Sequence, residues 1–254
     1  MLIDADVHIS PTNQGGNSIG VDELLRRMDR CGVDKAVTWL QPPYVRSEID
    51  AGNAYVVQAT RDHPDRILGF GWADPNLGVE RAIADARRAV DDGCYGVKLN
   101  GAQNGYPIDD PRLAMPVIAA IAEMGTVLAL HVGADAPDFT HPARVATIAL
   151  AFPELRILVV HMGGSAFHDL SAAAIAVARE HPNLTLVGSA VRAIPILAAV
   201  RALGADRVCF GSDTPFELMH VELAKYRALL DGEISPEEIA GVMGGTIARV
   251  LGLS

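Results

Sequence analysis

The sequence predicts an α/β protein, a (β/α)8 TIM barrel, on three observations. The chain has 254 residues, of which 50% are hydrophobic, so it can fill a large core as one domain over residues 1–254. Eight short runs of apolar and β-branched residues alternate with Ala- and Leu-rich segments of helical character. Polar residues stand at the same end of five of these runs. Eight strands, each followed by a helix, are typical of a barrel.

The predicted elements are named here by residue range, in chain order. Strands are expected at 2–8, 35–40, 66–72, 95–100, 126–132, 155–162, 184–190 and 207–213. Helices are expected near 20–31, 49–62, 78–92, 111–124, 142–151, 167–180, 193–203 and 215–230, with a last helix near 235–250. Junctions such as "DHPDRI" and "EHPNLTL" place a proline between helix and strand, because proline cannot continue a helix.

A doubly wound open sheet is the main alternative to the barrel. That fold is favoured where a G-x-G-x-x-G turn follows the first strand. No such turn follows residues 2–8, so the barrel remains the preferred prediction.

Composition narrows the class of partner and the compartment. The formal net charge of −10 argues against nucleic acid and against an anionic membrane surface as partners. The start of the chain lacks the apolar region of a signal peptide, and no apolar run is long enough to span a bilayer. The three cysteines, Cys31, Cys94 and Cys209, are widely spaced, which is typical of reduced thiols. A cytoplasmic protein is therefore expected.

The first predicted strand, "IDADVHI", has an alternating pattern. Asp4, Asp6 and His8 occupy every second position, so a regular strand directs all three to one face. A solvated edge strand explains this pattern, and so does a site that needs the side chains together. Asp4 is expected to have a structural role, either deeper in the barrel or capping a neighbour, because only the strand ends reach an active site.

The carboxyl ends of the strands are where a barrel of this kind holds its active site. Five strands carry polar residues there, namely Asp6 and His8, Lys98 and Asn100, His131, His161, and Asp213. Parallel strands are normally apolar on both faces, and a buried charge is costly unless it is paired or binds a metal. Three imidazoles and two carboxylates at one mouth are a ligand set for a divalent metal.

With these motifs the chain resembles the amidohydrolase superfamily, in its "amidohydrolase 2" branch. That branch holds metal-dependent hydrolases and decarboxylases related to aminocarboxymuconate-semialdehyde decarboxylase. The resemblance rests on "IDADVHI", "GVKLN", "LALHVG", "ILVVHMGG", "FGSDTPF" and "GGTIARVLGL", which cover nearly the whole chain. It implies a barrel with one divalent metal, zinc first and manganese or iron as alternatives, and a homodimer.

Carried over by position, the resemblance implies a metal held by four residues, Asp6, His8, His131 and Asp213. His161 then acts on the substrate or on the activated water. The usual motif of the first strand is His-x-His, whereas this chain has Asp6 in the first position, as decarboxylases of the branch have Glu. Asp6 is therefore expected either to bind the metal or to orient His8 without touching it.

Three further residues are candidates for binding a carboxylate-bearing small molecule. Lys98 faces the mouth by strand parity, although it can instead pair with a carboxylate such as Asp4. Arg46 follows the second strand, where most loop arginines are solvated. Trp39 lies near the end of that strand and can stack on a ring, or it can belong to the core.

The predicted function is hydrolysis of a small-molecule amide, lactone or ester by metal-activated water, with His161 and Asp213 as the catalytic residues. The same residues suit the alternative, a metal-dependent non-oxidative decarboxylase, in which an acid or imidazole protonates carbon. A barrel that has lost catalysis and only binds is the third hypothesis.

Overall fold

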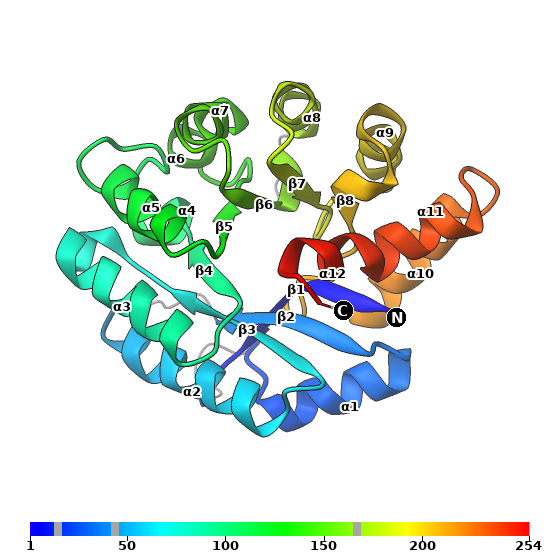
Figure 1. Cartoon of the computed structure of the whole chain (residues 1–254). Coiled ribbons are helices and arrows are strands. Elements are labelled where there is room, and N and C mark those ends of the chain that lie inside the picture. The colour runs from blue at the N-terminus through cyan, green and yellow to red at the C-terminus, as the bar shows by residue number, and fades with distance from the viewer. Residues whose placement is uncertain (13–16, 42–45, 165–168, 254) are drawn as a thin grey trace.

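A computed structural model of the chain describes residues 1–12, 17–41, 46–164 and 169–253. Its centre is a sheet of eight parallel strands in sequential order. The strands are β1 (Ile3–Ile9), β2 (Lys35–Leu40), β3 (Ile67–Trp72), β4 (Gly96–Leu99), β5 (Val127–His131), β6 (Arg156–Val160), β7 (Leu184–Val187) and β8 (Val208–Cys209). The strands form the inner ring of a barrel and the helices form the outer ring (Figure 1).

The helices follow the strands around the outside of the ring. They are α1 (Val21–Cys31), α2 (Ile49–Asp62), α3 (Val79–Asp91), α4 (Gly101–Asn104), α5 (Ala114–Glu123), α6 (Pro137–Thr140), α7 (Pro142–Ala151), α8 (Ser171–Glu180), α9 (Ala193–Leu203), α10 (Met219–Leu230), α11 (Pro236–Ala240) and α12 (Thr246–Leu251). No helix in the described part of the chain is both long and apolar enough to cross a membrane.

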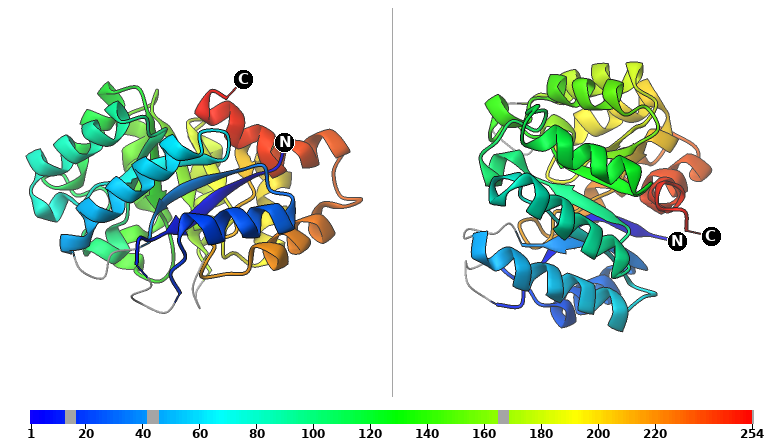
Figure 2. Two further views of the ribbon diagram at one scale, coloured as in Figure 1. Left: turned by 90° about the horizontal axis from the view of Figure 1, so that it is seen from below. Right: turned by 60° about the vertical axis from the view of Figure 1, so that its left-hand side comes forward.

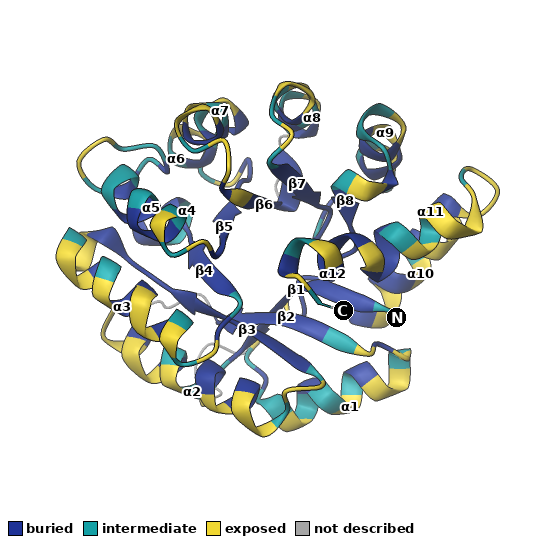
Figure 3. Cartoon of the chain, viewed as in Figure 1, coloured by how far each residue is buried: buried dark blue, intermediate teal, exposed yellow. Residues whose placement is uncertain are grey.

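Two apolar layers explain why the ring is stable. Side chains from the strands meet inside the barrel, where Ile247 and Leu251 of α12 pack against them. The opposite strand faces pack against the helices, so the strands are buried on both sides, whereas yellow exposed residues mark the outer helix faces (Figure 3). Both termini lie at the same end, beside α12 (Figure 2). Because α12 covers this end of the barrel, the opposite end is the one where a site can open.

The barrel closes between its last and first strands through backbone hydrogen bonds. The N–H of Ala5 donates to the carbonyl of Phe210 over 3.0 Å, and the N–H of His8 donates to the carbonyl of Thr214 over 2.8 Å. β8 itself has only two residues, because the chain beyond Cys209 leaves regular strand geometry while it pairs with β1. The eighth predicted strand, 207–213, was therefore too long.

The predicted (β/α)8 barrel is confirmed, with local differences. The last helix, predicted near 235–250, is two helices joined by a π-helical turn over Gly241–Gly245. In this turn Gly244 packs against the start of the chain. A residue with a Cβ would not fit there, because the Cβ would lie 2.4 Å from the carbonyl oxygen of Met1. The helix predicted over 167–180 is observed from Ser171, and its first two residues lie outside the described residues.

A register shift in β1 corrects the expectation that Asp4, Asp6 and His8 share one face. Between Asp4 and Val7 the pairing with β2 slips. Ile3 and Ala5 therefore pack inside the barrel, while Val7 packs under the helices. Asp4, next to Ile3 and Ala5, points away from the interior and accepts hydrogen bonds from the backbone N–H groups of Asp6 and Ser212. Its role is structural, as expected.

Candidate metal centre

A pocket of about 320 Å³ opens at the carboxyl ends of the strands. Its lining comes from the ends of β1, β4, β5 and β6 and from the segment after β8. The lining residues are His8, Asn100, Ala102, Gln103, His131, Asp135, Ala136, His161, Asp213 and Phe216. The five polar strand ends singled out in the sequence thus meet at one mouth, as the barrel requires.

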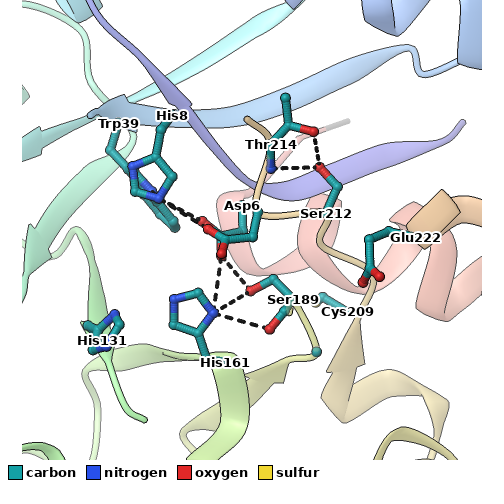
Figure 4. Close-up of polar contacts among 12 residues, drawn as sticks. Asp6, His8, Trp39, His131, His161, Ser189, Cys209, Ser212, Thr214 and Glu222 are labelled. Atoms are coloured by element: carbon teal, nitrogen blue, oxygen red, sulfur yellow. Dashed lines mark hydrogen bonds and ion pairs between the residues drawn. The ribbon is translucent and has the colours of Figure 1, made fainter. Parts of the chain in front are cut away.

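His8 has both ring nitrogens engaged, and Figure 4 shows its ring beside Asp6 and Trp39. Its Nδ1 lies 2.9 Å from the carbonyl oxygen of Leu40, so Nδ1 carries the proton and donates it. Its Nε2 accepts from the indole N–H of Trp39 over 3.1 Å, so Nε2 carries a lone pair. The same nitrogen lies 3.4 Å from Oδ1 of Asp213 and 3.6 Å from Oδ1 of Asp6. A lone pair therefore faces two carboxylates.

Asp6 is fully buried and only half satisfied. Ser189 donates its hydroxyl to Oδ2 of Asp6, and Nδ1 of His161 lies 3.7 Å from that oxygen. The other oxygen, Oδ1, has no hydrogen-bond partner among the described residues. His161 is positioned by the same serine, since its Nδ1 lies 3.1 Å from both the carbonyl and the hydroxyl oxygen of Ser189. Buried oxygens without a partner call for a ligand or a cation.

Two of the clustered residues have unusual backbones. His161 has φ of 66° and Asp213 has φ of 59°, although neither is glycine. The N–H of Asp213 donates to the carbonyl of Asp6 over 2.9 Å, which fixes the segment after β8 against β1. Left-handed backbone at a non-glycine residue costs energy and is concentrated at functional sites. Its presence at both residues agrees with a site built for chemistry.

His131 lies at the edge of this group. Its Nε2 is 3.1 Å from both carboxylate oxygens of Asp135, and its ring centroid is 4.7 Å from that of His161. Burial acts to raise the pKa of Asp135, but the hydrogen bond and charge of His131 outweigh it and lower that pKa. In this conformation the nitrogen of His131 that borders the pocket is held by Asp135.

Burial opposes charge throughout the site. It lowers the pKa of His8 to about 4 and that of Lys98 to about 8. It raises the pKa of Asp213, and the charge of Asp6 adds to this effect. Burial acts to raise the pKa of Asp6 as well, but the charges of His161 and Lys98 leave that pKa below its usual value. Two carboxylates close together in a dry site gain most from a bound cation.

The side chains fit a divalent metal. Ligand atoms of Asp6, His161 and Asp213 lie within 4.8 Å of one another, and all three residues are buried. The lone pair of His8 faces two of these carboxylates, and a cation between them would turn that repulsion into attraction. Of the four ligands that the resemblance implies, the structure brings Asp6, His8 and Asp213 together, adds His161, and leaves His131 against Asp135.

The three residues expected to bind substrate lie outside the pocket lining. Lys98 is 1% exposed, and its Nζ lies 3.9 Å from the ring centroid of Trp39, with no hydrogen-bond partner among the described residues. Trp39 is fully buried in the barrel interior. Arg46 donates to a carboxylate oxygen of Asp74 and to the carbonyl of Asn104, each over 2.5 Å.

Sequence reasoning missed several residues of the site. Ser189 lies two residues beyond β7, so the rule applied to the other strand ends would have found it. Asp135 lies four residues after His131, and Phe216 follows the conspicuous Asp213 motif. The ring of Phe216 meets that of His8 edge-on, with centroids 5.3 Å apart, and provides an aromatic wall for the pocket.

Comparison with known proteins places the chain in a family. The sequence model of the family described as "Amidohydrolase" matches residues 3–253. No curated protein sequence matches the chain.

Solved structures of similar fold cover almost the whole chain. A TIM-barrel protein of Bordetella bronchiseptica has a TM-score of 0.81 at 18% identity, over 99% of this chain and 98% of the other. The 5-carboxyvanillate decarboxylase of Sphingomonas paucimobilis has a TM-score of 0.77 at 19% identity, over 100% and 99%. A dihydroxybenzoic acid decarboxylase of Polaromonas, solved with manganese and 2-nitroresorcinol, has a TM-score of 0.75 at 18% identity, over 99% and 97%.

Proposed function

This chain belongs to the amidohydrolase family, and we propose that it is a metal-dependent decarboxylase of a small aromatic carboxylic acid. The observation that carries the proposal is the group of Asp6, His161 and Asp213, whose ligand atoms converge beside an aromatic wall in a small pocket. Structures of similar fold support decarboxylation, since they include decarboxylases of ring-bearing acids. The sequence had favoured hydrolysis first and decarboxylation second, and the proposal reverses that order.

The pocket suits a substrate with a single ring. Its volume of about 320 Å³ lies at the small end of ligand pockets in general. Phe216, which is 36% exposed, offers a ring edge to the pocket, while Asn100 and Gln103 supply polar atoms in its lining. An aromatic acid would pack its ring beside Phe216 and direct its carboxylate toward the position where Asp6, His161 and Asp213 would hold the metal.

Asp6, His161 and Asp213 would hold the metal, with His8 as a fourth ligand through Nε2. A divalent ion bound there supplies a Lewis acid that neutralises and orients an anionic substrate. Manganese is the first choice for the proposal, because a site of carboxylates and imidazoles accepts it and a structure of similar fold holds it. Zinc, the first choice from sequence, is the alternative.

The chain's own residues would handle the proton. When carbon dioxide leaves, the electron pair of the broken C–C bond stays on the ring carbon, which then takes up one proton. Asp213 lines the pocket and is the group proposed to deliver it, through the carboxylate oxygen that does not hold the metal. Ser189 keeps His161 in place through its carbonyl and hydroxyl oxygens. The surrounding apolar barrel strengthens these polar contacts.

Hydrolysis of an amide, lactone or ester remains the second candidate. The observation in its favour is that the pocket brings Asp213 and His161 to a surface that water can reach. In that case Asp213 would take a proton from water and His161 would polarise the carbonyl. Both candidates use the same residues, so only product analysis separates them.

The test is a product assay on chelator-treated protein reloaded with Mn²⁺ or Zn²⁺. A panel of hydroxybenzoic acids is assayed for release of carbon dioxide, and a panel of esters, lactones and amides is assayed for hydrolysis. In heavy water, decarboxylation must place deuterium on the carbon that lost the carboxylate. Release of carbon dioxide with this label supports the proposal, while hydrolysis without it supports the second candidate. Metal binding without any turnover would favour a barrel that only binds.

Two expectations, the homodimer implied by the resemblance and the carboxylate-bearing substrate inferred from Lys98 and Arg46, are carried forward as proposals. The homodimer is checked by sedimentation at micromolar concentration, where a monodisperse monomer would contradict it. A carboxylate-bearing substrate is checked by comparing each acid with its methyl ester in the same assay.

A further inference from the structure

The hydrogen bond from Trp39 occupies Nε2 of His8, which is the same nitrogen that faces the proposed metal position. The indole N–H of Trp39 donates to Nε2 of His8 over 3.1 Å (Figure 4). The same Nε2 faces Asp213 at 3.4 Å and Asp6 at 3.6 Å, so it is also the atom that would bind a metal. A lone pair cannot accept a hydrogen bond and coordinate a metal ion at once.

His8 cannot resolve this conflict by presenting its other nitrogen. Nδ1 lies 2.9 Å from the carbonyl oxygen of Leu40, the last residue of the neighbouring strand β2. A carbonyl accepts only, so this contact keeps the proton on Nδ1 and the lone pair on Nε2. The ring of His8 also makes edge-on contacts with the rings of Trp39 and Phe216, with centroid distances of 5.9 Å and 5.3 Å.

Trp39 is equally fixed on its own side. Its side chain is fully buried, and its ring meets that of Phe70 edge-on with centroids 5.7 Å apart. The ammonium of Lys98 lies 3.9 Å from its ring centroid. Because the indole N–H is buried away from solvent, losing its acceptor on His8 carries a free-energy cost.

We propose that Trp39 is a positioning residue that competes with the metal for Nε2 of His8, and so weakens the metal site and reports its occupancy. The inference rests on the metal site of the proposed function. The indole bond selects the tautomer of His8 that a metal needs, and the metal must then break that bond to bind. Binding of the ion is thereby coupled to the environment of one tryptophan.

The first experiment measures affinity for Zn²⁺ by calorimetry in wild type and in Trp39→Phe. Phenylalanine keeps an aromatic ring below Lys98 but lacks the N–H. Since one net hydrogen bond no longer opposes binding, the variant should bind Zn²⁺ about three- to tenfold more tightly. Mere loss of packing would act in the opposite direction, because a loosened site binds metal more weakly. The sign of the change separates competition from structural damage.

The second experiment follows tryptophan fluorescence during titration with Zn²⁺, which unlike Mn²⁺ is not a paramagnetic quencher. The chain has two tryptophans, so Trp72→Phe isolates the emission of Trp39. Trp72 donates its N–H to the side-chain oxygen of Asn104 over 3.0 Å, so its replacement leaves the donor to His8 in place. The emission of Trp39 should shift and saturate at one equivalent, with the dissociation constant found by calorimetry.

The outcomes separate the two proposals. If wild type binds no Zn²⁺ or Mn²⁺, the metal site is wrong and this inference falls with it. If wild type binds the metal but Trp39 emission stays constant in Trp72→Phe, Trp39 does not compete and only this inference is overturned. Equal or weaker Zn²⁺ affinity in a folded Trp39→Phe protein overturns it too. If Trp39→Phe does not fold, the fluorescence titration decides.

Discussion

Two polar clusters, each built around buried carboxylate or amide groups, lie near the mouth of the barrel and differ in how completely these groups are hydrogen-bonded. The first, here the Asn104 cluster, consists of Arg46, Trp72, Asp74, Asn76 and Asn104. The second, the Asp6 cluster, consists of Asp6, His8, Lys98, His161 and Asp213. Both place charged or amide groups among apolar strands, where an unpaired group is costly. Only the first is satisfied by the chain's own atoms.

The carboxylate and carbonyl oxygens at the centre of the Asn104 cluster are paired with donors from the same cluster. Asp74 accepts from Arg46 with one oxygen and from the N–H of Asn76 with the other. The carbonyl of Asn104 accepts from Arg46 and Asn76, and its amide oxygen accepts from the indole of Trp72. The burial of Asp74 and Asn104 therefore needs no ligand to explain it. Their hydrogen bonds join the loop after β3 to α4, which is a structural role.

The Asp6 cluster is different, since it keeps groups that the chain cannot pair. Oδ1 of Asp6 and Nζ of Lys98 are buried without a hydrogen-bond partner among the described residues. The His8 lone pair faces two carboxylates. Buried groups of this kind persist where a ligand or cation completes them. Buried polar groups that lack a hydrogen-bond partner thus indicate a candidate functional site, whereas polar burial alone does not.

The largest expected effect is loss of metal from the Asp6 cluster in Asp213→Asn. Asparagine tolerates the left-handed backbone at this position, so the fold should persist. Removal of one anionic ligand should weaken Mn²⁺ binding more than about hundredfold, since even residues behind the ligands cost about 10–100-fold. The readout is metal content by elemental analysis after dialysis, with calorimetry.

The matched control is Asp74→Asn, which changes another buried aspartate, in the Asn104 cluster. It should bind Mn²⁺ as wild type does. Equal metal loss in both variants, or in neither, would break the distinction between the two clusters.

The free energy of unfolding should show the opposite pattern, with the larger loss from the substitution in the Asn104 cluster. Asp74→Ala leaves Arg46 and the N–H of Asn76 without their acceptor, so it should lower the free energy of unfolding by about 2 kcal/mol. In chelator, Asp213→Asn should raise that free energy by about 1 kcal/mol, because it removes one of two buried carboxylates that repel each other. Urea unfolding with EDTA present measures both. A loss of stability in both variants would mean that the Asp6 cluster is also a structural network.

Lys98 provides a smaller and sharper test. Its buried ammonium partly neutralises Asp6 and Asp213, so it should compete electrostatically with a bound cation. Lys98→Met keeps the length of the side chain and removes the charge, and should tighten Mn²⁺ binding by about three- to tenfold. Calorimetry checks this change.

The control for Lys98 is Lys98→Arg, which retains the charge and should not tighten binding. Weaker metal binding in Lys98→Met would show that the lysine supports the site instead of opposing the ion.

Much of the fold was accessible from the sequence because its signals are local. Apolar runs and proline or glycine junctions predict the eight strands without tertiary information, and all eight are observed. The cluster at the mouth followed from one rule about strand ends, which brought His8, His161 and Asp213 together. Pairings across the barrel could not be predicted in this way.

The misses have physical causes. The register slip in β1 depends on how β1 pairs with its neighbours, so strand parity alone misplaced Asp4. The bond between Trp39 and His8 depends on the alignment of β1 with β2, where these two residues are opposite each other. Asp135 holds His131 from a loop whose course the sequence does not specify.

Arg46 gives the smallest expected effect and tests the last sequence expectation. The side chain is 46% exposed and is engaged with Asp74 and Asn104, so we expect it to support the loop and not to bind the substrate carboxylate. Arg46→Lys keeps the charge but loses the second donor, and should lower the free energy of unfolding by about 0.5–1 kcal/mol. Once a substrate is identified, its KM should stay within about twofold of wild type, because about 0.4 kcal/mol corresponds to such a ratio. A tenfold rise in KM with unchanged stability would instead place Arg46 on the substrate, and the satisfied cluster would then share in binding.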